Sequence, residues 1–149
     1  LMRKCLSLLF LFLISNVFSQ ENEYFIDANF DVNNRLVEIY QTIDFTNTTS
    51  NSLNYIILND WAHSYSNPKT PLGKRLSEDF TLNFQRSTKN QRGFTNIIHI
   101  KSDSIILEHT RLKVNIDLVK VKLSNALMPN QKIRINIKYN IKIPISDFT

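Results

Sequence analysis

The residues of this chain best suited to metal chemistry are its three histidines, His63, His99 and His109. A zinc site gathers several ligands, and sequence signatures usually place two of them a few residues apart. None of the three histidines has another His, Cys or suitably spaced carboxylate at such an interval, and Glu108 before His109 belongs to no H-E-x-x-H motif. We therefore expect no metal site here. His99 shares the strand parity of Ile97, which predicts a partly buried, hydrogen-bonded imidazole.

Nucleophilic and phosphate chemistry have no stronger support. No serine stands in a G-x-S-x-G motif, and the adjacency of His63 and Ser64 implies no geometry. Residues 73–75 (Gly-Lys-Arg) resemble a phosphate-binding loop only in part, because its upstream glycine is missing and arginine replaces the hydroxyl residue. A solvated first turn of a helix explains them better.

Paired carboxylates could act as a general acid and base if the fold brought them together. The candidates are Glu78 and Asp79 on a predicted helix, with Asp103 or Asp117 elsewhere. Nothing in the sequence indicates such a meeting, and charged residues of this kind are usually solvated. We expect no catalytic residue among them.

Basic and aromatic residues give two further candidate surfaces. A basic stripe would attract an anionic polymer or a membrane, but the wet face of an amphipathic strand is the simpler interpretation, since no aromatics are interleaved to stack on bases. Trp61 and Tyr65 could form a sugar-binding loop, although aromatics after a strand more often close the end of a sheet. The basic residues are Lys132, Arg134, Lys138 and Lys142, with Lys120 and Lys122.

Strands must position all of these side chains. Over residues 132–142, isoleucines and one tyrosine take one parity, while Lys, Arg and Asn take the other. A period of two predicts a long strand with one dry and one wet face. Such a strand needs partners along its whole length, and we expect its unpaired edge to be a site of aggregation.

The rest of the chain predicts an all-β fold of mostly antiparallel, saddle-like or sandwich-like sheets. Asn33 and Asn34 suit a tight hairpin turn, the strand over 53–58 should be covered on both faces, and a bulge is expected near Leu118 and Val119. One short helix is expected around 71–86, because Thr70 and Pro71 resemble a capped start and apolar residues then recur every four positions. The predicted strands are 24–31, 36–45, 53–58, 94–100, 105–108, 114–123 and 132–142.

Residues 1–19 have the organisation of a signal peptide: a basic head, an apolar run too short for a stable membrane anchor, and a small residue, Ser19, at the end. The only cysteine, Cys5, precedes the apolar run, which argues against a lipoprotein. We expect an exported protein, periplasmic or extracellular, without disulfides and with no membrane association after cleavage. Without Arg3 and Lys4 the formal charge falls from +5 to +3, which does not indicate nucleic-acid binding.

Six sequence blocks follow one another in a distinctive order and spacing. They are an extended hairpin over 24–45, L-N-Y-I-I-L-N-D-W at 53–61 with Tyr65 and Ser66, T-P-L-G-K-R at 70–75, R-G-F-T at 92–95, D-L-V-K-V-K-L at 117–123 and L-x-P-N-Q-K-I at 127–133. Together they resemble the N-terminal saddle-shaped β-domain of the aminopeptidase N-like zinc metallopeptidases (gluzincins), in the form found in secreted proteins of the Bacteroidetes. The resemblance covers nearly the whole chain after residue 19.

In that family the β-domain precedes a thermolysin-like catalytic domain and helps to wall its active-site cleft. The family's H-E-x-x-H zinc motif and its G-x-M-E-N-type motif for the substrate amine do not occur in this sequence. The resemblance therefore implies that residues 20–149 are a C-terminally truncated, non-catalytic domain with no catalytic, cofactor-binding or metal-binding residue. Zinc, the catalytic domain and the peptide substrate would belong to the parent protein.

A second hypothesis belongs to a different class. The chain would then be a free-standing secreted β-sandwich module that binds glycans or cell-surface partners through the loop 61–65. The reading frame beyond Thr149 separates the two hypotheses.

Overall fold

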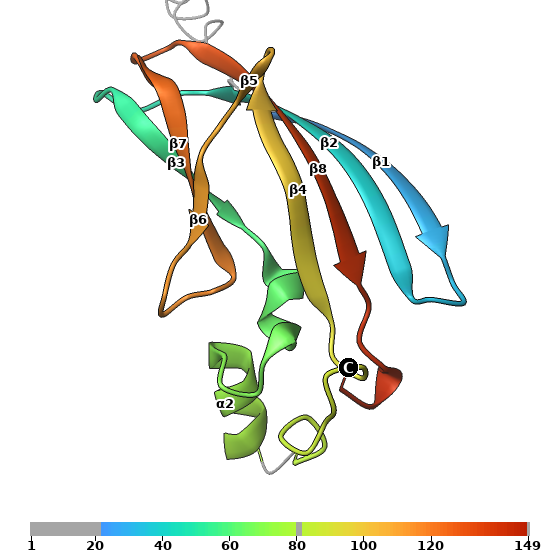
Figure 1. The fold of residues 1–149 in the computed structure, drawn as a ribbon. Coiled ribbons are helices and arrows are strands. Elements are labelled where there is room, and N and C mark those ends of the chain that lie inside the picture. The colour runs from blue at the N-terminus through green and yellow to red at the C-terminus, as the bar shows by residue number, and fades with distance from the viewer. Residues whose placement is uncertain (1–21, 80–81, 149) are drawn as a thin grey trace, which may run out of the picture.

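The computed structural model describes residues 22–79 and 82–148, which form two antiparallel sheets, one α-helix and two short 3₁₀ helices (Figure 1). This confirms the prediction of an all-β fold with one short helix. The predicted signal peptide over residues 1–19 lies outside the described residues. The elements are β1 (Glu23–Asp31), β2 (Leu36–Thr46), β3 (Leu53–Asn59), η1 (Trp61–Ser66), α2 (Pro71–Glu78), β4 (Phe94–Ser102), β5 (Ile105–Ile106), β6 (His109–Arg111), β7 (Leu118–Leu127), β8 (Lys132–Lys142) and η2 (Ser146–Phe148).

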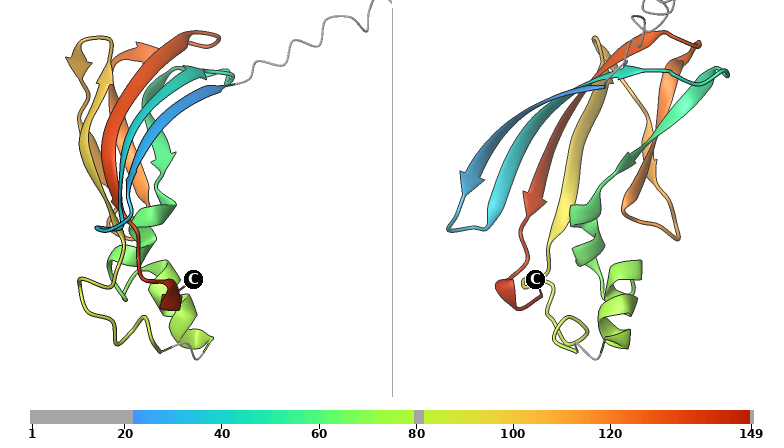
Figure 2. Two further views of the ribbon diagram at one scale, coloured as in Figure 1. Left: turned by 90° about the vertical axis from the view of Figure 1, so that its right-hand side faces the viewer. Right: turned by 180° about the vertical axis from the view of Figure 1, so that it is seen from behind.

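The strands form a five-stranded sheet in the order β1-β2-β8-β4-β5 and a three-stranded sheet in the order β3-β7-β6. In the three-stranded sheet, β3 runs toward β4 and ends beside it at η1, whereas β1 and β2 fan away from the three-stranded sheet (Figures 1 and 2). Seen from the front and from behind, β1 and β2 lie on the side of the five-stranded sheet away from the three-stranded sheet (Figures 1 and 2). The smaller sheet therefore covers only part of the larger one.

The core lies where the inner faces of the two sheets meet. In the five-stranded sheet the alternation of β2 and β8 puts Ile43 opposite Ile135 on this face, and Ile137 lies opposite Ile100 of β4. The three-stranded sheet contributes Val119 and Val121 of β7 and their neighbours. The buried core cluster contains no residue of β1; it is Ile43, Ile56, Ile100, Leu107, Val119, Val121, Leu123, Leu127, Ile135 and Ile137.

The long alternating strand predicted over 132–142 is confirmed as β8, but its edges are not free. β2 pairs with β8 over its whole length, and β4 pairs with its other side from Asn136 to Lys142. The expectation of a long unpaired edge on this strand was therefore wrong, since only residues 132–135 lack a strand partner on one side. The long free edge of the sheet belongs to β1, since the opposite edge strand, β5, has only two residues.

The predicted helix is shorter than the sequence pattern indicated. Its start is confirmed, because Thr70 Oγ1 accepts a hydrogen bond from the Gly73 amide at 3.0 Å and Pro71 occupies the first helical position. It ends at Glu78 rather than near residue 86. Acidic residues at a helix C-terminus oppose the helix dipole, and Phe84, beyond the helix, is fully buried among other aromatic side chains.

Several finer predictions were wrong because tertiary pairing overrode local alternation. Residues 112–117 form a loop between β6 and β7, so the strand predicted from 114 begins only at Leu118. The register shift between β3 and β7 lies where Leu53 to Tyr55 face Leu127 to Lys122, instead of near Leu118 and Val119. β3 is an edge strand whose Tyr55 and Ile57 are exposed on one face. The hairpin turn predicted at Asn33 and Asn34 is confirmed, although the positive φ in it belongs to Arg35.

Candidate functional site

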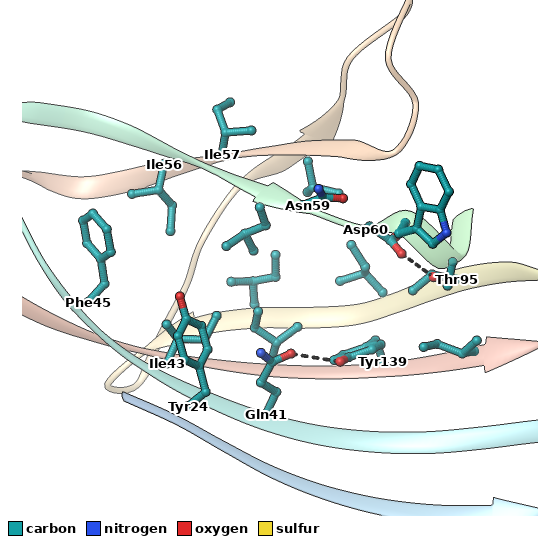
Figure 3. A pocket seen from close by; sticks show the side chains of 18 of the residues that line it. Tyr24, Gln41, Ile43, Phe45, Ile56, Ile57, Asn59, Asp60, Thr95 and Tyr139 are labelled. Carbon is teal, nitrogen blue, oxygen red and sulfur yellow. Dashed lines mark hydrogen bonds between the residues drawn. The ribbon is translucent and has the colours of Figure 1, made fainter. Parts of the chain in front are cut away.

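A groove of about 520 Å³ lies between the inner faces of the two sheets, on the side where they diverge (Figure 3). Most of its lining is aliphatic, from Ile43 of β2, Ile56 of β3 and the facing residues of β4 and β8. Tyr24 of β1 lines one side, and the polar residues Asn59, at the end of β3, and Asp60, directly after it, also line the groove. A concave, largely apolar site with a few polar groups is the usual form of a binding site.

One hydrogen-bonded polar pair interrupts the apolar wall. Tyr139 of β8 donates its hydroxyl to Gln41 Oε1 of β2 at 2.9 Å (Figure 3). Burial, and then the negative charge of Asp60, raise the pKa of Tyr139 above its ordinary value, so the phenol stays protonated near neutral pH. The pair can hydrogen-bond a ligand, but a protonated phenol and an amide supply neither a nucleophile nor a general base.

A charged clamp closes one end of the groove. Arg111 Nη2 of β6 lies 2.6 Å from Asp60 Oδ2, and Thr95 Oγ1 of β4 donates to Asp60 Oδ1 at 2.6 Å. Arg111 Nη1 also donates to the Ile116 carbonyl at 2.9 Å. Because the clamp joins the residue before η1 to both sheets, its geometry explains how the divergent sheets are fixed relative to each other.

His63 belongs to the same cluster. Its Nδ1 lies 3.1 Å from the Thr95 carbonyl oxygen and 3.2 Å from the Thr95 amide nitrogen. Burial first, and the positive charge of Arg111 second, lower the pKa of His63 below its ordinary value, against the smaller opposing effect of Asp60. The imidazole is therefore neutral at physiological pH and serves as a hydrogen-bonding strut.

The two aromatic residues of the loop 61–65 do not form a common platform. Trp61, the only tryptophan, lines the groove with more than half of its surface exposed. Tyr65 packs edge-to-face against Phe84, with ring centroids 6.1 Å apart, and Phe84 packs in turn against Phe148 at 5.2 Å. This loop, predicted as irregular, forms the 3₁₀ helix η1.

The structure does not bring the three histidines together. His63 lies in η1, His99 in β4 and His109 in β6. A register shift between Ile97 and His99 places Ile97 opposite Tyr139 on the inner face and His99 opposite Lys138 on the outer face, so the shared face that their parity predicted was wrong. The predicted partial burial of His99 is confirmed. Within 22–79 and 82–148, no group of three or more His, Cys, Asp or Glu is placed to hold a metal ion.

The candidate carboxylates lie on separate elements. Glu78 and Asp79 are exposed at the end of α2, and Asp103 lies in the turn between β4 and β5, at the opposite end of the molecule in Figure 1. Asp117 precedes β7, where its backbone carbonyl accepts from the Asp60 amide at 2.6 Å. No acid–base pair arises from this set.

In the basic row on β8, Arg134 is paired with an acid, and Lys138 and Lys142 contact neutral groups. Arg134 donates through Nε and Nη2 to the two oxygens of Asp44, both at 2.6 Å, and this ion pair lowers the pKa of Asp44. Lys138 Nζ lies 4.7 Å from the centroid of the Tyr40 ring. Lys142 donates to a backbone carbonyl of the β1–β2 turn.

The lysines of β7 are not an extension of that row. Lys120 and Lys122 lie on the outer face of the other sheet, where Lys120 Nζ sits 4.0 Å from the centroid of the Tyr55 ring and Lys122 Nζ lies 3.3 Å from Glu108. The structure thus separates the six cations into two sets on different sheets. A single continuous basic stripe, the weaker of the two interpretations, is contradicted.

Sequence reasoning missed the clamp and the polar pair in the groove. Asp60, Thr95 and Arg111 come from three separated segments, and no motif connects them. Gln41 did give a signal, since it is the one polar residue on the apolar parity of its strand. A glutamine in such a position needs a hydrogen-bond partner, which Tyr139 supplies.

Comparison of the sequence with protein-family models and with curated proteins finds no match. Among the described residues, no helix has the length and apolar character needed to cross a membrane.

Proposed function

We propose that this β-domain is the non-catalytic front part of an exported zinc aminopeptidase-like protein, and that its groove helps to wall a peptide-binding cleft. The proposal rests on the sequence resemblance together with one structural observation. That observation is the inner face of the five-stranded sheet, which continues past the groove onto β1 without a cover. Tyr24, Ile26 and Phe30 share the inner parity, and each is more than half exposed.

An uncovered apolar face of this kind favours an architectural role. Exposed contiguous apolar surface usually marks an interaction site, and each of these side chains would contribute about 1.5–3 kcal/mol if fully buried by a partner. The face adjoins a groove in which Gln41 and Asn59 offer polar atoms for orienting a peptide backbone. A second domain packed on this side would complete the cleft.

Zinc chemistry is assigned to another part of the parent protein. The described histidines lie on three different elements and on different faces, so these residues do not fit a tetrahedral zinc site. We assign no catalytic step to the residues of the present chain. Its residues fasten the two sheets to each other at one end of the groove through the clamp of Asp60, Thr95 and Arg111.

The test compares the purified chain with the polypeptide encoded by an extended reading frame, using amino-acid amides as substrates. We expect hydrolysis by the longer polypeptide and none by the present chain. Turnover by the present chain, abolished by a chelator, would contradict the proposal.

A second candidate function is the binding of glycans or cell-surface partners, favoured by the exposed indole of Trp61 beside the groove. Titration of the chain with oligosaccharides, followed by the emission of its only tryptophan, tests this candidate. Calorimetry measures the oligosaccharide affinity of two variants, Trp61→Ala and Tyr55→Ala, the latter changed on the outer face of the other sheet. Loss of affinity in Trp61→Ala together with unchanged affinity in Tyr55→Ala would support this function. Retention of affinity in Trp61→Ala would exclude it.

A further inference from the structure

The free edge of β1 is the longest unpaired backbone in the described part of the chain. β1 pairs with β2 from Glu23 to Asp31, and no described strand pairs with its other side. All of its residues are exposed. In an antiparallel edge strand, the amides and carbonyls of alternate residues point outward and can accept a further strand.

The two faces of β1 differ in charge, since all of its acidic residues lie on one face. The inner face carries Tyr24, Ile26 and Phe30, which are apolar and exposed. The outer face carries the acidic residues Glu23 and Asp27 on either side of the exposed Phe25, and β1 contains no lysine or arginine. Asp27 makes no ion pair or side-chain hydrogen bond to another described residue.

A third acid, Asp31, lies at the end of the strand. Its carboxylate accepts from the Asn34 amide at 3.0 Å and from Asn34 Nδ2 at 2.7 Å, so it is already partly occupied by the turn. Glu23 lies opposite Asp44, whose charge is matched by Arg134. Asp27, in the middle of the edge, is therefore the acid most available to a new cation.

We propose that the free edge of β1 binds an extended segment in which apolar and basic residues alternate, so that the segment becomes a sixth strand of the sheet. Its apolar side chains lie beside Tyr24, Ile26 and Phe30 on the inner face. Its lysines or arginines lie beside Glu23 and Asp27 on the outer face. Main-chain hydrogen bonds supply affinity and the alternate side chains supply specificity, as in other cases of strand addition.

Charge argues against a second copy of this chain as the occupant. Antiparallel self-pairing that uses the whole strand places Asp27 against Asp27 and Glu23 against Asp31. Parallel self-pairing in register places each acid beside its own copy. Directly opposed like charges destabilise a strand pair, whereas opposite charges stabilise it.

The attraction is local rather than a property of the whole molecule. The full chain carries a formal charge of +5, so a basic peptide is repelled by the molecule as a whole. Binding of such a peptide therefore reports on the acidic outer face of β1. This inference does not depend on the proposed function, because it requires no catalytic domain.

The experiment uses two synthetic peptides as long as β1, one alternating Lys and Ile and the other alternating Glu and Ile. Calorimetry measures their affinities for the chain, and hydrogen exchange followed by NMR locates the binding. We expect at least about tenfold tighter binding of the Lys peptide, weaker binding as salt increases, and slower exchange at alternate β1 amides. Equal affinities for the two peptides, or protection confined to other strands, would overturn the proposal.

Charge reversal of the central acid supplies the matched variant. Asp27→Lys changes an exposed side chain, and we expect it to weaken binding of the Lys peptide by about tenfold or more. Glu78→Lys makes the same charge change at an exposed position of α2 and should leave the affinity unchanged. Thermal melts verify that both variants fold. If the free chain sediments as a dimer and its β1 amides are protected from exchange, a second copy is the occupant, and the proposal is contradicted.

Discussion

At the scale of single residues, the ion pair between Asp60 and Arg111 is the contact that most directly fixes the groove. Their side chains are only 13% and 23% exposed, and the pair is supported by Thr95 and by the Ile116 carbonyl. A largely desolvated ion pair costs much more to break than a surface pair, because the remaining charge is left without a partner.

We expect Arg111→Met to lower the free energy of unfolding by about 2–3 kcal/mol, somewhat less than for a fully buried pair. Urea denaturation measures the change. Lys122→Met is the matched control, since its pair with Glu108 is 72% and 80% exposed, and the expected change is within about 0.5 kcal/mol. Similar losses for both variants would show that the clamp is no stronger than an ordinary surface ion pair.

His63 gives the chain a defined pH dependence. Burial and Arg111 lower the pKa of His63 in the folded state below its ordinary value, so the unfolded state binds more protons between the two pKa values. The contribution of His63 to the free energy of unfolding is therefore complete above its unfolded-state pKa. This contribution is lost as the pH drops through this window toward its folded-state pKa. In His63→Gln this part of the pH dependence should disappear. Denaturation midpoints between about pH 7 and pH 5 measure it, and an unchanged slope in the variant would contradict the assignment.

Residue-level predictions from sequence succeeded where local capping chemistry decides the structure and failed where distant segments meet. Thr70 was predicted to cap the start of the helix, and its Oγ1 accepts a hydrogen bond from the Gly73 amide. The clamp could not be predicted, because the alternation that defines β4 and the short β6 carries no information on which strands become neighbours.

At the scale of elements, the close approach of another backbone segment to α2 explains why this helix contains a glycine. Gly73 is buried, and a Cβ built at this position would lie 2.1 Å from the Pro68 carbonyl oxygen. Its neighbours Lys74 and Arg75 are exposed, as expected for a solvated first turn. The glycine therefore serves packing, which explains why it occurs within a helix that it would otherwise weaken.

We expect Gly73→Ala to destabilise the chain by about 1–3 kcal/mol, because overpacking forces the Pro68 segment away from the helix. Thermal and urea denaturation measure the effect. Ser77→Ala, at an exposed position of the same helix, should be neutral or slightly stabilising. A stabilised Gly73→Ala variant would mean that the approach of Pro68 is easily relieved.

Strands were easier to predict than their partners. The alternation over 132–142 predicted the length and the two faces of β8, but not that β2 and β4 would flank it. The bulge in β4 moved His99 to the outer face although its sequence parity is that of Ile97. Local periodicity cannot reveal one inserted residue when polar and apolar side chains are both tolerated on that face.

At the scale of the whole molecule, the main feature is a five-stranded sheet only partly covered by a three-stranded one (Figure 2). The uncovered part contains β1 and one side of the groove. Composition and periodicity predicted the all-β class, but the incomplete cover is a tertiary property that no segment of the sequence contains. It is also the property on which the proposed role as one wall of a cleft depends.

The reading frame beyond Thr149 gives the most direct test of that role, because the proposal assigns the catalytic groups to another part of the polypeptide. Sequencing the coding region downstream of Thr149 is the measurement. Our account predicts an H-E-x-x-H motif and a later glutamate about one domain further on. A stop codon directly after Thr149, or a sorting domain in place of the catalytic domain, would contradict it.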